Sequence, residues 1–230
     1  MEKYELTILL PCLNEEKNLP NCLAKARNFL SENNINGEIL LADNGSTDSS
    51  KKIAKSLNVR VIDVKEKGYG NALREGIKKA QGKYIIIADS DDSYDLSNIS
   101  AFYEALKEGY DFVIGNRFKG KMEKGSMPFL NKQVGNPILS YIPRKIFKTP
   151  NYDYHCGLRG GTRQKLIELD LESKGMELAS EMLIKAVLKN YKIKEININY
   201  YKSKYPRKSH LKPFRDSIRH LKIIFKLKKL

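Results

Sequence analysis

The sequence predicts an α/β fold, with a doubly wound and mainly parallel sheet covered by helices on both faces. Through the first half of the chain, short apolar runs alternate with segments whose apolar residues recur at helical spacing, and each run ends in polar or charged residues. This alternation is typical of βαβ units. We expect strands at residues 4–10, 37–43, 59–64, 83–89 and 111–116, and helices at 16–30, 46–57, 69–80 and 96–107.

The second half of the chain is less regular. Residues 121–163 carry four prolines and several glycines among apolar residues, so we expect an irregular, mobile cap there. A helical pattern at 175–190 and a strand pattern at 192–201 then return the chain to the core. With 230 residues, 41% of them hydrophobic, the chain has the size and apolar content of one globular domain.

The charge is strongly positive and unevenly distributed. The formal net charge is +15, and the segment 201–230 contributes many cations against a single acid, Asp216. A surplus of this size implies an anionic partner: a nucleic acid, a membrane surface or a phosphorylated small molecule. The three cysteines lack C-x-x-C spacing and are odd in number, which favours a reducing cytosol over a disulfide framework. No apolar run is long enough to predict a membrane span.

The stretch YIIIADSDDSYD, at residues 84–95, joins a buried strand to a cluster of carboxylates. Asp89 and Asp91 form a D-x-D pair, and extended backbone would point both side chains the same way. Two carboxylates so close raise each other's pKa unless a cation lies between them. Hard oxygen ligands suit Mg²⁺ or Mn²⁺, and such sites combine one or two carboxylates with phosphate oxygens. A solvated acidic turn is the alternative interpretation.

Two other strand ends carry candidate ligand contacts. Asp43 ends a strand in ADNGSTDSS, where its carboxylate could accept hydrogen bonds from a base or a ribose. The glycines of KGYGNALREG do not form G-x-G-x-x-G, because Leu73 takes the place of the third glycine, and no Walker A sequence is present. A dinucleotide-binding dehydrogenase and a P-loop NTPase are therefore disfavoured.

In combination and in this order, these motifs resemble family 2 glycosyltransferases of the GT-A fold. The matching segments are LLPCLNEEKNL, LADNGSTDSS and GYGNALREGIKKAQGKYIIIADSDDSYD. The segments GNRFKG, DYHCGLRG, GMELASEMLIKA and YPRKSHLKPFRDSIRHLK resemble the dolichol-phosphate mannose synthase type, the polyprenyl-phosphate hexosyltransferases. The resemblance implies a Rossmann-like sheet and transfer of one sugar from a nucleotide diphosphate, UDP-hexose or GDP-mannose, to a dolichyl or polyprenyl phosphate.

The resemblance also implies roles for individual residues. Asp89 and Asp91 would bind Mg²⁺ or Mn²⁺, and Ser93 stands where mannose synthases carry a glutamine. Arg117 of GNR would face the phosphates of the reaction zone, and Asp153 is a further catalytic candidate. The nucleotide sugar would be bound by Pro11, Asn14, Glu15, Asp43, Gly68, Asp89 and Ser90. The acceptor phosphate would be held by Lys132, Asn136, Arg159 and Arg207.

The charge of the acceptor decides which further residues the reaction needs. A phosphate acceptor is already anionic, so it requires cations for positioning and no general base. A sugar hydroxyl would require a carboxylate base, which Asp153 or Glu181 could supply. The sequence therefore leaves two hypotheses: an inverting, metal-dependent polyprenyl-phosphate hexosyltransferase, or a soluble family 2 glycosyltransferase acting on a glycan hydroxyl.

The basic C-terminal segment predicts contact with an anionic membrane surface. Phe214, Ile218, Leu221 and Phe225 recur at helical spacing among cations, and residues 136–147 have a similar mixture. Nucleic acid is not an expected partner, because no recognition motif is present. We expect a glycosyltransferase domain at 1–200, with a nucleotide-sugar half at 1–119 and an acceptor half at 120–200. Residues 201–230 would form the membrane-interface segment, on the cytoplasmic face.

Overall fold

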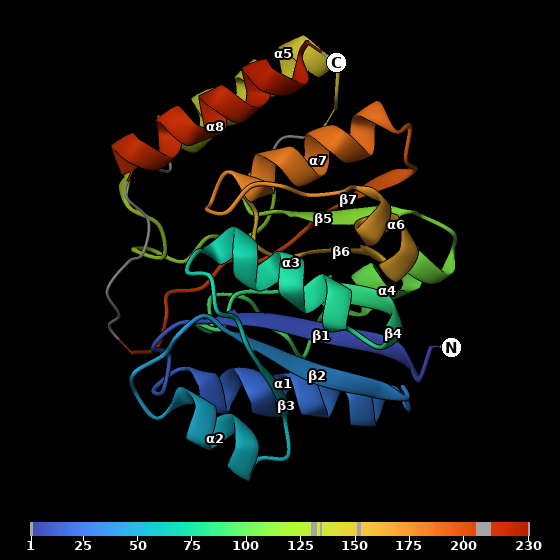
Figure 1. Cartoon of the computed structure of the whole chain (residues 1–230), viewed down its shortest axis with the longest axis vertical. Helices are drawn as coiled ribbons and strands as arrows, with labels where there is room; N and C mark the ends of the chain where they lie inside the picture. The colour runs from blue at the N-terminus through green and yellow to red at the C-terminus, as the bar shows by residue number, and fades with distance from the viewer. Residues whose placement is uncertain (1, 130–132, 134, 151–152, 206–212, 230) are drawn as a thin grey trace.

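A computed structural model of the chain describes residues 2–129, 133, 135–150, 153–205 and 213–229. Its centre is a seven-stranded sheet in the order β3-β2-β1-β4-β6-β5-β7 (Figure 1). The strands are β1 (Tyr4–Cys12), β2 (Gly37–Asp43), β3 (Arg60–Asp63), β4 (Gly82–Ile87), β5 (Phe112–Asn116), β6 (Arg159–Thr162) and β7 (Ile193–Asn197). The helices are α1 (Leu19–Glu32), α2 (Ser50–Ser56), α3 (Tyr69–Lys79), α4 (Ser100–Lys107), α5 (Asn136–Phe147), α6 (Arg163–Glu168), α7 (Leu178–Leu188) and α8 (Pro213–Leu227).

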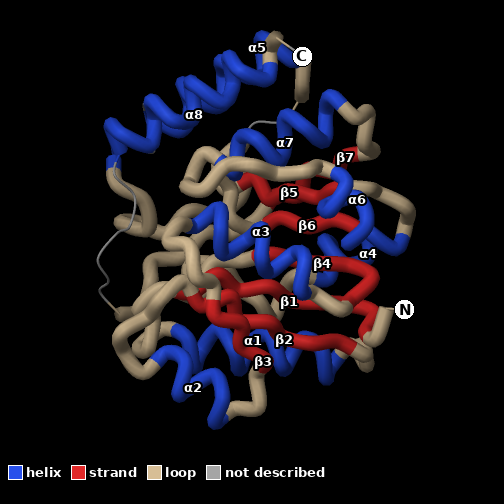
Figure 2. Tube along the Cα trace, in the orientation of Figure 1, coloured by secondary structure: helices blue, strands red, loops and turns tan. Residues whose placement is uncertain are grey.

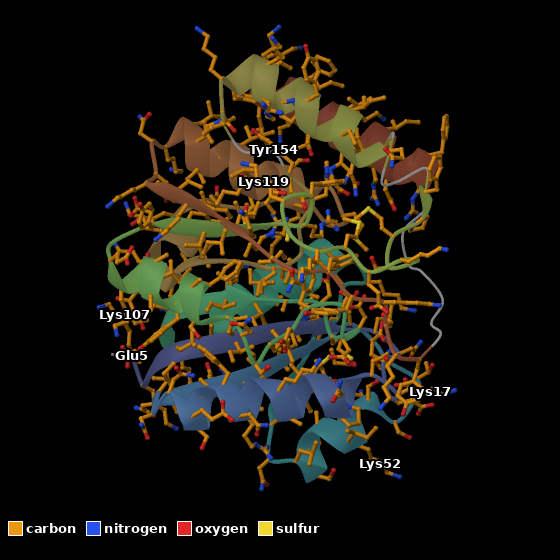
Figure 3. The ribbon with its side chains drawn as sticks, turned by 180° about the vertical axis from the view of Figure 1, so that it is seen from behind. Glu5, Lys17, Lys52, Lys107, Lys119 and Tyr154 are labelled. Carbon is orange, nitrogen blue, oxygen red and sulfur yellow. The ribbon has the colours of Figure 1, made fainter. Side chains whose placement is uncertain are left out.

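The sheet is mainly parallel and is covered on both faces, as predicted. Strand β1 pairs in parallel with β2 and β4, so that Leu9 lies opposite both Leu40 and Ile87. Helices α3 and α7 cover the face toward the viewer in Figure 1, and α1 and α4 cover the opposite face, seen in Figure 3. Strands buried on both faces are continuous apolar runs, which is why the sequence reveals them.

The element ends differ from the predicted ones where polar side chains bond to nearby backbone. Strand β4 ends at Ile87 and α4 begins only at Ser100. Between them, Asp91 accepts a hydrogen bond from the Ser93 amide, and Asp95 accepts one from the Ser97 amide. These Asx turns compete with regular structure and delay the start of the helix.

The expectation of an irregular cap after Lys119 is wrong in part, because α5 and β6 lie in that region. Strand β6 is antiparallel to both of its neighbours, β4 and β5. Its sequence, RGGT, allows close approach: a Cβ at Gly160 would lie 2.5 Å from the Ile85 carbonyl oxygen. Helix α5 forms although Pro143 lies inside it.

The basic C-terminal segment contains a helix, α8, which packs against α7 and α5 (Figure 1). Ile224 and Leu227 are buried in the hydrophobic core. Phe214 and Phe225 face outward, with 82% and 50% of their surface exposed. Within the described ranges, no helix is long and apolar enough to cross a membrane.

A buried carboxylate joins three strands at the end of the sheet remote from the motif loops. Glu38 of β2 is 8% exposed and accepts hydrogen bonds from the Thr7 hydroxyl at 2.8 Å and the Gln81 amide at 2.7 Å. Arg60 of β3 donates to both of its oxygens, at 2.8 and 3.0 Å. The Thr7 hydroxyl accepts in turn from the Gly82 amide of β4.

We expect Glu38→Ala to lower the free energy of unfolding by about 2–3 kcal/mol, because it leaves buried donors without an acceptor. Urea unfolding monitored by circular dichroism would measure the loss. The matched control is Glu32→Ala, since Glu32 is an exposed glutamate at the end of α1. Equal unfolding midpoints for the two variants would contradict the importance of this network.

Candidate functional site

The motif loops meet at the carboxyl edge of the parallel strands. In Figure 2 the tan loops after β1, β2, β3 and β4 gather on the left, at the end opposite the N-terminus. After β1 the chain continues outward to β2 and β3, and it then returns to β4 on the other side of β1. Ligands of open α/β sheets bind at such a switch point.

The loop after β1 is tied to the loop after β2. Asn14 has a positive φ of 59°, and its side-chain oxygen accepts from the Thr47 amide at 2.8 Å. The backbone N–H of Asn14 donates to the Ser46 hydroxyl, and that of Glu15 donates to the Ser50 hydroxyl. Asn14 and Glu15, both expected in the nucleotide pocket, thus lie at its wall and shape two of its loops.

Asp43 is the buried carboxylate of this pocket. Its Oδ2 accepts from the amides of Gly45 and Ser46, both at 3.1 Å. Its Oδ1 is buried, and no donor in the described part of the chain bonds to it. A buried carboxylate oxygen is expected to be hydrogen-bonded. Asp43 therefore has a free acceptor position that fits the predicted contact with a nucleotide.

Three other predicted nucleotide contacts, Pro11, Gly68 and Ser90, lie on the same edge. The Ser90 hydroxyl donates to the Pro11 carbonyl at 2.8 Å and joins the ends of β4 and β1. The Gly68 amide donates to the side-chain oxygen of Asn44 at 2.6 Å. The residues predicted to bind the nucleotide sugar therefore lie around the switch point.

The two aspartates of D-x-D are held by different neighbours. Asp89 Oδ1 accepts from the Tyr69 hydroxyl at 3.1 Å. Asp91 is 2% exposed, and its Oδ1 accepts from the Ser93 amide at 3.0 Å and the Ser93 hydroxyl at 2.5 Å. Ser93, which occupies the position of a metal-binding glutamine in the resemblance, here orients Asp91.

The remaining acids of the stretch serve the fold. Asp92 has a positive φ of 62° and accepts hydrogen bonds from Asn21 and from Lys25, the latter at 2.9 Å. Asp95 accepts from the Ser97 hydroxyl at 2.6 Å. Both carboxylates are therefore engaged in local structure, and Asp89 and Asp91 remain the pair predicted to bind a metal.

A buried ion pair lies next to the D-x-D pair. Arg117 donates from Nε and from its terminal nitrogen to the two oxygens of Asp153, at 2.7 and 2.8 Å. The guanidinium also lies 5.3 Å from the ring centroid of Tyr200. Burial raises the pKa of Tyr200, Arg117 lowers it, and the charges of Asp91 and Asp89 raise it. The next residue, Tyr201, donates its backbone N–H to the Ser93 carbonyl at 3.0 Å, which connects this segment to the D-x-D loop.

The predicted acceptor residues are less clearly assembled. Arg159 is buried and donates to the carbonyls of Cys156 and Ala179, which gives it an architectural role in the described structure. The Asn136 amide contacts Met127 Sδ at 3.3 Å at the start of α5. Lys132 and Arg207 lie outside the described residues. Binding of an acceptor by any of these residues remains a prediction.

Glu181, the other carboxylate considered as a base, is buried and supports a loop. It accepts from the backbone amides of Glu172 and Ser173, at 2.9 and 2.8 Å, and pairs with Lys185 at 2.8 Å. In this loop the Lys174 carbonyl accepts a hydrogen bond from the Gly70 amide of α3. Glu181 therefore fixes the position of the start of α3.

The donor set fits a divalent cation that shares its ligands with a diphosphate. Among the described residues, no group of three or more His, Cys, Asp or Glu side chains could hold a metal ion. Asp89 and Asp91 are the two carboxylates predicted to bind such an ion. Mg²⁺ and similar ions are commonly bound by one or two carboxylates, with phosphate and water oxygens completing the shell.

Comparison with known proteins decides the family. The model of the family described as Glycosyl transferase family 2 matches residues 7–170. The chain belongs to this family. The resemblance found in the sequence is therefore confirmed, and the protein is a glycosyltransferase of the GT-A fold.

Several curated relatives come from Haloferax volcanii. The low-salt glycan biosynthesis hexosyltransferase Agl6 is 34% identical over 95% of this chain, and the chain spans 52% of that relative's length. A dolichyl-phosphate hexose transferase is 27% identical over 85% of the chain and 82% of its own length. Glucosyl-3-phosphoglycerate synthase from Mycobacterium tuberculosis, solved with Mn²⁺, UDP and phosphoglyceric acid, has a TM-score of 0.74 and 18% identity over 99% of this chain and 80% of its own.

Sequence reasoning did not find three residues that shape the site: Tyr69, Gly157 and Tyr200. Tyrosine and glycine occur widely in loops and carry no charge to draw notice. The one available signal was position, because Tyr69 begins α3 and Tyr200 lies three residues after the end of β7.

The ionised form of Glu181 stabilises the fold. Burial raises the pKa of Glu181, but Lys185 and the amides of Ser173 and Glu172 outweigh burial and hold the pKa below its usual value of 4.5. This stabilisation is present above the ordinary glutamate pKa and is lost as the pH falls through the lower pKa of the folded state.

We therefore expect Glu181→Gln to be less stable than the wild type at neutral pH, and the gap to close on acidification. Urea unfolding of both proteins at a series of pH values from 7 down to about 3 would measure it. Glu32→Gln, at an exposed site, should track the wild type throughout. A gap that stays constant across this range would contradict the assignment.

Proposed function

We propose that the protein is a metal-dependent, inverting hexosyltransferase that moves a hexose from a nucleotide diphosphate sugar to a polyprenyl or dolichyl phosphate at a membrane surface. The observation that carries the proposal is the position of Arg117. This buried cation directly follows β5 and is paired with Asp153, and the next residue, Phe118, lines an apolar pocket of about 500 Å³. The pocket is lined by Phe118, Pro137, Ile138, Ser140, Tyr141 and Arg144.

The donor would bind at the switch point. Asp43, with its free oxygen, would accept a hydrogen bond from the base or ribose, and Asp89 and Asp91 would hold Mg²⁺ or Mn²⁺ beside the diphosphate. When bound, the metal supplies Lewis-acid stabilisation of the charge that develops on the leaving diphosphate. The complexes of glucosyl-3-phosphoglycerate synthase with UDP and Mn²⁺ support a UDP-hexose over GDP-mannose.

The acceptor would approach from the side of α5. A phosphate needs cations to position it, and Arg117 offers one whose orientation is fixed by Asp153. The apolar walls of the adjacent pocket suit the first units of a prenyl chain, and Arg144 adds a second cation there. The Haloferax volcanii dolichyl-phosphate hexose transferase supports the same acceptor class.

The carboxylates that a hydroxyl acceptor would require are already engaged. Both oxygens of Asp153 accept from Arg117, and those of Glu181 accept from two backbone amides. A base must be able to take a proton from the acceptor. This geometry favours an anionic phosphate over the alternative, a glycan hydroxyl.

Contact with an anionic membrane would involve α5 and α8. These helices pack together at one end of the molecule (Figure 1). Ile138, Tyr141, Phe214 and Phe225 are each at least half exposed, and Arg and Lys residues lie among them. Aromatic and aliphatic side chains interleaved with cations are typical of helices that lie in the lipid interface. The pocket beside Arg117 would then open toward the lipid, on the cytoplasmic face.

The decisive experiment is transfer of radiolabelled sugar to a polyprenyl phosphate, with UDP-glucose and other UDP-hexoses and GDP-mannose as donors and Mn²⁺ or Mg²⁺ added. We expect Asp91→Asn to lose at least about a hundredfold in metal-dependent transfer, since charge stabilisation of the leaving group is removed. Asp95→Asn, an acid of the same stretch, is the control and should retain activity. Failure of the wild type with every donor, together with transfer to a glycan hydroxyl, would contradict the proposal.

Membrane contact is tested by co-sedimentation with vesicles containing anionic phosphatidylglycerol. We expect the double variant Phe214→Ser, Phe225→Ser to weaken partitioning onto the vesicles by about tenfold or more. The wild type gains free energy by moving the two phenyl rings from water into the lipid, and serine loses this gain. Ile167→Ser removes an exposed apolar residue on α6, far from α5 and α8, and serves as the control. Equal binding by all three proteins would refute the role of α8.

A further inference from the structure

The motif KGYGNALREG, which matches no phosphate-binding loop, has a structural explanation. Gly68 has a φ of +137°, a conformation that favours glycine, and a Cβ there would fall on the Lys174 carbonyl. A Cβ at Gly70 would likewise fall on the Ser173 carbonyl. The Gly70 amide donates to the Lys174 carbonyl at 3.0 Å. Both glycines are therefore required for α3 to begin flush against the loop that Glu181 supports.

Between these glycines stands Tyr69, the first residue of α3. Its backbone is fixed on both sides by the contacts of Gly68 and Gly70 with the 173–174 loop. Its hydroxyl lies 3.1 Å from Asp89 Oδ1. At neutral pH a phenol carries its proton and a carboxylate does not, so the tyrosine is the donor.

The other oxygen of Asp89 is confined from the opposite side. A Cβ at Gly157 would fall on Asp89 Oδ2, so only glycine leaves room for the carboxylate in its present orientation. Gly157 is itself held by a hydrogen bond from its amide to the Tyr94 hydroxyl at 2.8 Å. The Asp89 carboxylate thus lies between a donor on α3 and the backbone that leads into β6.

We infer that Tyr69 is a positioning residue for the metal carboxylate Asp89, with Gly157 as the steric limit on the other side. The inference rests on the proposed function, since it concerns the metal that Asp89 and Asp91 would share with the diphosphate. A partner that fixes the orientation of a metal-binding side chain commonly contributes about 10–100-fold to metal affinity. Tyr69 takes this part through its hydrogen bond to Oδ1 of Asp89.

The test is the affinity of the full chain for Mn²⁺ in the presence of UDP, measured by titration calorimetry or by the electron paramagnetic resonance signal of free Mn²⁺. We expect Tyr69→Phe to raise the Kd for Mn²⁺ by about tenfold. In transfer assays the Mn²⁺ concentration for half-maximal rate should rise by a similar factor, while kcat at saturating Mn²⁺ stays within about twofold. A merely structural role would not produce this split.

Tyr191→Phe is the matched control, because it removes a hydroxyl that donates to the Lys165 carbonyl, remote from Asp89. Gly157→Ala tests the opposite wall independently and should also weaken Mn²⁺ binding, since the added methyl displaces Oδ2. A Kd for Tyr69→Phe within twofold of the wild type would overturn the inference. Because these titrations contain no acceptor, failure of polyprenyl-phosphate transfer would contradict the proposed function alone. A wild type that binds no Mn²⁺ would overturn the inference together with the metal assignment.

Discussion

The arrangement of the site depends on the ion pair between Arg117 and Asp153. Arg117 follows β5, Asp153 precedes β6, and Tyr200, which stacks against the guanidinium, follows β7. The pair therefore ties three strand ends together next to the D-x-D carboxylates. Breaking a buried pair by removing one partner typically costs about 3–5 kcal/mol, because a charge is left buried and uncompensated. The fold consequently keeps a cation at the point where substrate phosphates are expected.

The same pair balances the charges of the site before any ligand binds. Asp89 and Asp91 accept hydrogen bonds from the hydroxyl groups of Tyr69 and Ser93, which orient the two carboxylates. The positive charge of Arg117 is paired with the carboxylate of Asp153. Groups fixed in advance in this way need little reorganisation when charge moves from a glycosidic bond to a leaving group.

Much of the nucleotide half of the fold could be predicted, because β1, β2 and β4 are continuous apolar runs that end in polar motifs. The D-x-D pair was predictable from its place after such a run. Strand β6 could not be predicted, since RGGT is short, has two glycines at its centre and lacks the alternation of a strand. The strand forms because its glycines let neighbouring backbones approach. The positions of Tyr69 and Tyr200 in the site could not be predicted either. They follow from contacts with Asp89 and Arg117, which are distant in the sequence, and a local sequence pattern does not reveal such contacts.

The place of β6 in the sheet has a consequence for how the chain unfolds. Strand β5 pairs only with β6 and β7 in the described sheet, and β6 in turn joins β5 to β4. Residues 1–119 and 120–200 are therefore consecutive along the chain but interlocked in the sheet. Because neither part can lose its structure without leaving strand edges of the other unpaired, we expect the sheet to unfold as one cooperative unit. A break between the halves would separate β5 from both of its neighbours.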